Sequence, residues 1–423
     1  GRIQPAQRSH PTVDEVVDVL SAGGSTWTRP EVMRTICDLV PAVAQMSGHR
    51  WAQALERACD RVLEHGINLD AHTTTPATRR GDGRSVWVDP LVPHLTTEQI
   101  LAEEERIVVW ATDAQLADPT PSTSVDVVGL DVCQTYAARA IAGHDQLVVV
   151  VGPAGAGKTT MLERAVADLH THGRPVLGVA PTAKAARVLE RETRMRCDTV
   201  AKILWEHTRP NRDPSPEYQL ARGATIIVDE AGMIGTHSLH TLTQLADTHD
   251  WRLALVGDPR QLQAVGRGGM FNELCTTARS IELEHIHRFS APWEAAASLK
   301  LRHGDPAGLD AYLEHGRVIA GALTEHTAAI ATEWITHHTD NDTTAITTCA
   351  NEHVDAINRA IQTARLDAGQ LNLGLRVAIG GGEHAHPGDV VATRRNEPTP
   401  RHRCRRAGPQ PRTVDRHRHP PRR

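Results

Sequence analysis

The residues best suited to chemistry lie at 152–160, where the sequence reads Gly-Pro-Ala-Gly-Ala-Gly-Lys-Thr-Thr. Glycines let the backbone curl with its N–H groups pointing inward, and such a loop ahead of a helix binds phosphate. Lys158 can place its charge on the β- and γ-phosphates, and the Thr159 hydroxyl can bind Mg²⁺. The pattern predicts a nucleoside triphosphate site. Its expected contacts are Gly152, Gly155, Gly157, Lys158, Thr159 and Thr160.

The residues on both sides of this loop have the order that a phosphate site needs. Residues 147–151 are Leu-Val-Val-Val-Val, an apolar run typical of a buried strand. Residues 161–169 have the pattern of a helix, so a helix should begin where the loop ends. The loop is therefore expected at one edge of a sheet, with a helix N-terminus facing the phosphates.

Two acids follow a second apolar run, Ile-Ile-Val at 226–228. Asp229, at the expected tip of a strand, can order the Mg²⁺ shell. Glu230 is placed to orient or deprotonate an attacking water. An Asp-Glu pair carries little information by itself, but about 70 residues after a phosphate loop it predicts the acidic half of the same site.

The order of apolar and helical segments predicts the fold class. Strands are expected at 147–151, 176–180, 225–229 and 252–256, with helical segments between them. Alternation of this kind is typical of an α/β domain whose parallel sheet is covered on both faces. The prediction is a P-loop NTPase fold, with the site at the carboxyl ends of the strands.

The segment Gly-Asp-Pro-Arg-Gln-Leu at 257–262 resembles motif III of superfamily 1 helicases. The resemblance implies a RecA-like domain that binds ATP and Mg²⁺, with Gln261 sensing the γ-phosphate and Asp258 in the nucleotide site. Gln134, ahead of the phosphate loop, resembles the glutamine that reads adenine. Arg288, in His-Arg-Phe, resembles the motif IV arginine that reaches the γ-phosphate. The catalytic residues implied are Lys158, Glu230, Gln261 and Arg288.

Two further segments resemble motifs that contact single-stranded DNA in these helicases. Residues 180–186 resemble motif Ia, which implies contacts from Pro181, Thr182 and Lys184. Thr199 lies where the next DNA-contact motif belongs. Single-stranded DNA is therefore the partner that the resemblance implies.

Within superfamily 1 the chain resembles the RecD-like branch, and more narrowly the helicase half of MobF-type (TraA/TrwC-like) conjugative relaxases of actinobacteria. The resemblance covers roughly residues 30–396 and implies ATP-dependent translocation along DNA from 5′ to 3′. The segments that carry it are 152–159, 229–233, 265–271 and 96–98.

The chain is expected to contain several parts. A strand at 344–349 and a helix at 352–366 suggest a second RecA-like domain, which is partial because motifs V and VI have no candidate. A relaxase nuclease half also has no candidate, so we expect a fragment of a longer protein that hydrolyses ATP poorly. The expected parts are a helical accessory region at 1–120, a RecA-like domain at 125–283, the partial second domain at 284–396 and a disordered basic tail at 397–423.

Composition limits the classes of protein that the chain can represent. Its seven cysteines form no Cys-x-x-Cys pair, which argues against a disulfide framework or a zinc site and favours the cytoplasm. No apolar run approaches the ~20 residues of a membrane span. The formal charge is −5, but nine arginines against two acids at 397–423 leave residues 1–396 at −12. DNA binding would therefore need a local basic surface.

Three alternatives stay open at this stage. The chain can be a RecD-type repair or recombination helicase without a role in conjugation. It can be a P-loop phosphotransferase unrelated to DNA, although the segment at 257–262 argues against this. It can also be a catalytically inactive, DNA-binding remnant of a decayed gene, since the tail resembles out-of-frame translation.

Overall fold

The computed structural model describes residues 11–40, 47–69, 94–339, 344–372, 374–379 and 382–391. It divides into two compact units, 1–317 and 318–423, and each is described by itself. The tail predicted at 397–423 lies outside the described residues. The bounds of the four parts expected from the sequence stay predictions.

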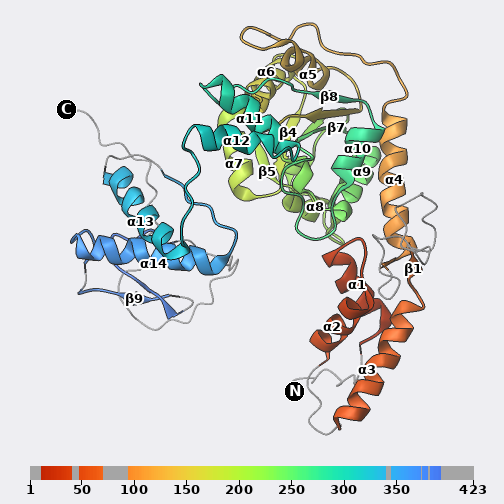
Figure 1. Ribbon diagram of the computed structural model, residues 1–423. Helices are drawn as coiled ribbons and strands as arrows, with labels where there is room; N and C mark the ends of the chain where they lie inside the picture. Colours follow the sequence, from red (N-terminus) through yellow and green to blue (C-terminus); the bar gives the residue numbers. More distant parts are fainter. Residues whose placement is uncertain are drawn as a thin grey trace, which may run out of the picture. The chain divides into compact units, whose positions relative to one another are not determined.

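The larger unit is built on a six-stranded sheet in which every neighbouring pair is parallel (Figure 1). The four strands expected from the sequence form, and two three-residue strands extend the sheet at its edges. This confirms the predicted α/β fold with a parallel sheet. In spatial order the strands are β5 (Cys197–Thr199), β4 (Val176–Ala180), β6 (Thr225–Val228), β7 (Arg252–Gly257), β3 (Leu147–Val151) and β8 (Ser280–Glu282).

Alternate residues of the strands enter two separate apolar cores, one on each face of the sheet. In β3, Leu147 and Val149 pack into one core, and Val148 and Val150 into the other. Because both faces are covered, all five residues of β3 are buried. The first face is covered by α8 (Val200–Thr208), α9 (Thr236–His249) and α10 (Met270–Thr277), and the second by α5 (Val132–Ala142), α6 (Lys158–Thr171) and α7 (Ala183–Thr193).

The N-terminal part of this unit is helical, as expected, and has its own small core. α1 (Val13–Gly23), α2 (Arg29–Leu39) and α3 (Gly48–Leu63) pack together, and the short strands β1 (Ile67–Asn68) and β2 (Leu95–Thr96) pair beside them. α4 (Glu98–Ala114) joins this region to the sheet domain. Its Ile100 lies in the N-terminal core, whereas Ile107 lies in the core of the sheet.

Two helices, α11 (Pro292–Arg302) and α12 (Ala307–Glu314), follow the sheet within the larger unit. The described part of the smaller unit contains α13 (Leu323–Thr339), α14 (Asn351–Asp367) and an antiparallel pair, β9 (Val377–Ala378) with β10 (His384–Ala385). Asp389 ties its last turns together by accepting bonds from the backbone N–H of His386 at 2.8 Å and from Gln362 Nε2 at 2.6 Å.

The strand expected at 344–349 is wrong. Its side chains do alternate in exposure, with Ile346 and Thr348 partly covered and their neighbours exposed. In the described part of the chain, however, no other strand pairs with this segment, and an isolated extended segment gains no ladder of hydrogen bonds. The helix expected at 352–366 is confirmed as α14.

Candidate functional site

Three neighbouring strands bring the predicted nucleotide residues to one edge of the sheet. β6, β7 and β3 lie side by side and run in the same direction, so their carboxyl ends share this edge. The phosphate loop follows β3, Asp229 and Glu230 follow β6, and the segment from Asp258 to Gln261 follows β7. Ligands of open parallel sheets bind at this kind of edge.

Two glycines give the phosphate loop its shape. Gly155 and Gly157 have φ angles of +85° and +71°, which glycine adopts at little cost. A Cβ atom at Gly155 would lie 2.4 Å from the Cβ of Arg288, and one at Gly157 would lie 2.3 Å from Gln134 Nε2. The loop therefore needs glycine both for its dihedral angles and for the close approach of its neighbours.

Lys158 begins α6 directly after this loop. Its Nζ donates a hydrogen bond to the carbonyl oxygen of Gly152 at 2.8 Å, so the ammonium group lies across the loop. Thr159 is partly covered, whereas Thr160 is exposed. The loop, the ammonium group and the free N–H groups of a helix N-terminus form an arrangement suited to a polyphosphate.

Gln134 is buried behind the phosphate loop. Its Nε2 donates to the carbonyl oxygen of Ala156 at 2.9 Å, and its Oε1 accepts from the backbone N–H of Asp131 at 3.0 Å. Asp131 caps α5 in return by accepting from the backbone N–H of Gln134. The glutamine thus supports the loop from α5, and its predicted role in reading adenine stays a prediction.

The segment after β8 closes over the other side of the loop. The backbone N–H of His287 donates to the carbonyl oxygen of Gly155 at 2.8 Å, which holds Arg288 against this glycine. His287 Nε2 lies 3.1 Å from a carboxylate oxygen of Asp131. Arg288 is exposed and so is free to turn toward a bound phosphate.

Asp229 and Glu230 form the acidic side of the site. Burial and the neighbouring charge of Glu230 raise the pKa of Asp229 to about 6, although Lys158 acts in the opposite direction. Glu230 adopts a left-handed conformation with φ of +51°, which is uncommon outside glycine. The two carboxylates repel each other, and a bound divalent cation would offset this repulsion. The pair therefore fits a divalent cation.

Metal binding at this edge would depend on the nucleotide. In the part of the chain that the structure describes, no group of three or more His, Cys, Asp or Glu side chains is arranged to hold a metal ion. Thr159 and Asp229 are the two predicted ligands, and Mg²⁺ prefers six oxygen ligands that include phosphates and water. The residues therefore fit a magnesium ion that arrives with a triphosphate.

Asp258 is held by an arginine that sequence reasoning missed. Arg302 of α11 forms a bidentate contact with it, with Nη2 at 2.9 Å from Oδ1 and Nε at 3.0 Å from Oδ2. Gln261 Nε2 lies 3.3 Å from Oδ2 of the same carboxylate. The hydrogen bond from Arg302 helps keep the pKa of Asp258 below its ordinary value. Asp258 is buried, so it positions the loop that carries Gln261.

The predicted DNA-contact residues lie at or just after the carboxyl ends of β4 and β5, the two strands farthest from the phosphate loop. Thr182 caps α7 by accepting from the backbone N–H of Ala185 at 3.1 Å, and Thr199 caps α8 by accepting from that of Lys202 at 3.1 Å. Ala180 and Thr199 are partners in the β4–β5 register, so both caps lie close together. Pro181 is partly covered and Lys184 is exposed.

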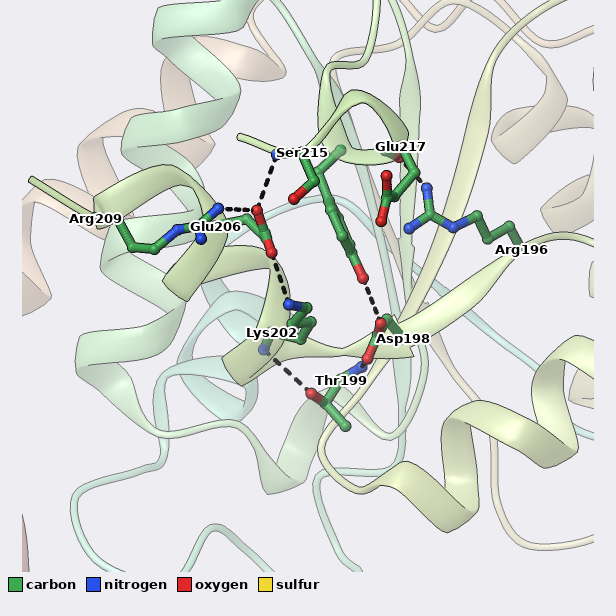
Figure 2. Close-up of polar contacts among 9 residues, drawn as sticks. Arg196, Asp198, Thr199, Lys202, Glu206, Arg209, Ser215 and Glu217 are labelled. Atoms are coloured by element: carbon green, nitrogen blue, oxygen red, sulfur yellow. Dashed lines mark hydrogen bonds and ion pairs between the residues drawn. The ribbon is translucent and has the colours of Figure 1, made fainter. Parts of the chain in front are cut away.

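A second polar network, which sequence reasoning also missed, fixes the segment after α8 (Figure 2). Glu206 is buried and accepts from Lys202 Nζ at 2.6 Å, from Arg209 and from the backbone N–H of Ser215 at 2.9 Å. These bonds, led by the one from Lys202, lower the pKa of Glu206 to about 2. Nearby, the Tyr218 hydroxyl donates to Asp198 at 2.5 Å. The segment is therefore tied to β5, which carries the predicted DNA contact Thr199.

The fold and the phosphate loop together define a P-loop nucleotide-binding domain of the RecA-like α/β class. Residues 129–323 match the family model described as an AAA domain. These residues include every predicted nucleotide and DNA contact.

Comparison with known proteins then identifies the chain's relatives. It is 29% identical over 341 residues to a probable conjugal transfer protein TraA from Sinorhizobium fredii, covering 78% of this chain and 28% of that protein. It is 37% identical over 168 residues to the ATP-dependent RecD2 DNA helicase of Deinococcus radiodurans, covering 38% of this chain and 22% of that one. These relatives confirm the predicted resemblance to RecD-like helicases and TraA proteins. The chain spans about a quarter of the length of these two relatives.

A solved structure of two coordinating Pif1 helicases at forked double-stranded DNA aligns with a TM-score of 0.34 and 19% identity. The alignment covers 44% of this chain and 51% of that one.

Among the described residues, none of the helices combines the length and apolar character needed to cross a bilayer.

Proposed function

We propose that this chain is the ATPase motor part of a DNA helicase that uses ATP and Mg²⁺ to move along single-stranded DNA from 5′ to 3′. The observation that carries the proposal is the shared carboxyl edge of the sheet. Loops suited to a triphosphate follow β3, β6 and β7, and loops resembling DNA-contact motifs follow β4 and β5. Nucleotide and DNA would therefore bind to one rigid element.

Each nucleotide residue has a part in the proposed reaction. Lys158 would leave Gly152 to bind the phosphates, and Thr159 and Asp229 would hold Mg²⁺, which offsets charge on the transferring phosphoryl group. Glu230 would orient the attacking water. Gln261, whose loop is fixed through Asp258, and Arg288, which lies against Gly155, would respond to the γ-phosphate.

The role in conjugation is the finer part of the proposal. The alignment with a TraA protein extends over 78% of this chain, whereas the alignment with RecD2 extends over 38%. The longer alignment supports a TraA-like parent, in which a relaxase nuclease domain would be a partner of this part. A RecD-type role in repair or recombination is the alternative, and the gene sequence upstream of Gly1 would distinguish the two.

Hydrolysis of ATP by the 423-residue chain, with and without single-stranded DNA, tests the proposal. We expect ATP binding and hydrolysis that single-stranded DNA stimulates, because the nucleotide and DNA loops would share one edge of the sheet. Lys158→Ala should remove both the basal and the stimulated rate. ATP turnover that DNA leaves unchanged, together with no binding of a single-stranded oligonucleotide, would overturn the proposal and favour a phosphotransferase.

A further inference from the structure

One face of α7 and the residue that ends it carry four exposed basic side chains. Lys184, Arg187 and Arg191 lie on the helix at spacings of three and four residues, and Arg194 is its C-cap. At about 100° per residue the three residues on the helix fall within an arc of about 60°. We call these four residues the α7 basic stripe.

The stripe has few charge partners of its own. Arg191 Nη2 lies 3.4 Å from Glu192, and both side chains are exposed, so this pair is weak. Within the described ranges, no carboxylate lies within ion-pair distance of Lys184, Arg187 or Arg194. Three of the four charges are therefore available to an outside partner.

The rest of the chain shows that this charge is local. Residues 1–396 carry a formal charge of −12, so the stripe stands against an acidic background. α3 also has three exposed arginines at helical spacing, Arg50, Arg57 and Arg61. There, however, Glu56 directly precedes Arg57 and Asp60 directly precedes Arg61, and Arg29 pairs with both acids. In α7 the two acids, Glu190 and Glu192, both flank Arg191, so Lys184, Arg187 and Arg194 have no acid next to them in the sequence.

The direction of α7 separates the stripe from the predicted path of single-stranded DNA. α7 begins at the carboxyl edge, where Thr182 caps it beside Thr199, and then runs back along the sheet (Figure 1). Its basic residues therefore lead away from the edge that would hold the single strand. Ten residues of helix span about 15 Å, a length over which one strand of B-form DNA presents about four phosphates.

We propose that the α7 basic stripe binds the phosphate backbone of duplex DNA next to the single-stranded segment on which the motor moves. This inference rests on the proposed function. It assigns α7 a partner that the loops at the carboxyl edge do not contact, and it gives the motor a preference for junctions between single-stranded and duplex DNA. Because phosphate contacts carry no base information, the preference would be independent of sequence.

The test compares two triple variants of the 423-residue chain with equal charge change. In the stripe variant Arg187, Arg191 and Arg194 are changed to Gln, and Lys184 stays because it is also a predicted single-strand contact. In the control variant Arg50, Arg57 and Arg61 are changed to Gln. Affinity is measured over a salt series for a forked DNA with a duplex arm and for a short single-stranded oligonucleotide, after unchanged Tm and ATP binding confirm folding.

We expect the stripe variant to bind the fork about tenfold more weakly or worse at low salt, with a slope of log K against log salt shallower by about 2.7. Its affinity for the short single strand should match that of wild type. The control variant should match wild type on both DNAs.

An unchanged fork affinity in the stripe variant, or an equal loss in the control, would overturn the inference. An equal loss on the single strand would overturn it as well, because the stripe would then belong to the single-strand path. Failure of the wild-type chain to bind any DNA would instead reject the proposed function.

Discussion

Asp229 and Glu206 are acids of the same sheet domain in opposite surroundings. Glu206 accepts hydrogen bonds from two cationic side chains and one backbone N–H, and its pKa falls to about 2. Asp229 is half-buried beside a second acid, and its pKa rises to about 6. A carboxylate with cationic partners stabilises the folded protein. A carboxylate beside a like charge lowers the stability unless a ligand offsets its charge.

The two ends of the carboxyl edge also differ in whether their charged side chains are already paired. At the predicted nucleotide end, Lys158 donates to a backbone carbonyl and has no ion pair within the described ranges, and Arg288 is exposed, so both cations can turn to an incoming ligand. At the far end, the groups around Glu206 are already paired with one another (Figure 2). Variants in the two regions should therefore affect different properties, activity in the first and stability in the second.

The largest expected effect is on catalysis. Glu230→Gln keeps the size of the side chain but removes the base, so ATP hydrolysis should fall by about 10²-fold or more. Binding of ATP should remain, because Lys158 and the phosphate loop are unchanged. Single-turnover hydrolysis and a separate binding titration measure the two properties. Loss of binding in proportion to hydrolysis would contradict the proposed role of Glu230.

Sequence reasoning could predict the nucleotide end of this edge because each group of its residues is close together in the chain. The phosphate loop and the acids at 229–230 each follow a strand within a few residues, so local pattern is enough to find them. Arg302 contacts Asp258 across 44 residues and has no motif around it. Such a pair depends on how α11 packs, which a single sequence does not reveal.

The shortest strands and the polar network around Glu206 also had weak signals in the sequence. β5 and β8 have three residues each, too few for an alternation to be recognised. The residues at 344–349 do alternate but lack a partner strand in the described part of the chain. Glu206 looks in the sequence like an ordinary surface acid of a helix. In the fold it also accepts from the backbone N–H of Ser215, nine residues later, where the chain returns.

An intermediate effect is expected from Asp229→Asn, which should stabilise the protein without nucleotide or Mg²⁺. The folded-state pKa of about 6 lies above the ordinary value of 3.8, so the carboxylate costs stability that builds up as the pH rises from about 4 to about 6. Removing the charge should raise the free energy of unfolding at pH 8 by about 1–2 kcal/mol, below the ~3 kcal/mol of the full shift. Hydrolysis should be lost at the same time.

Thermal unfolding in EDTA at pH 4 to 8 measures this effect. The variant and wild type should be similar near pH 4, and their Tm values should separate up to about pH 6 and then stay apart. Asp229→Ala is the control for loss of the side chain itself. A variant that is less stable than wild type at pH 8 would mean that the charge of Asp229 is compensated in the resting protein.

The smallest expected effect is the reverse one, from Glu206→Gln, because glutamine keeps the shape and one acceptor oxygen. The folded-state pKa of about 2 lies below the ordinary value of 4.5, so the carboxylate contributes stability that is complete above about pH 4.5 and is lost as the pH falls toward 2. The variant should have a lower Tm at pH 7, and the difference should narrow below pH 4.5. ATP binding should be unchanged, because the network does not reach the phosphate loop.

A Tm difference that is constant from pH 7 to pH 3 would show that Glu206 acts through shape alone. The contrast between Glu206 and Asp229 would then not be one of charge.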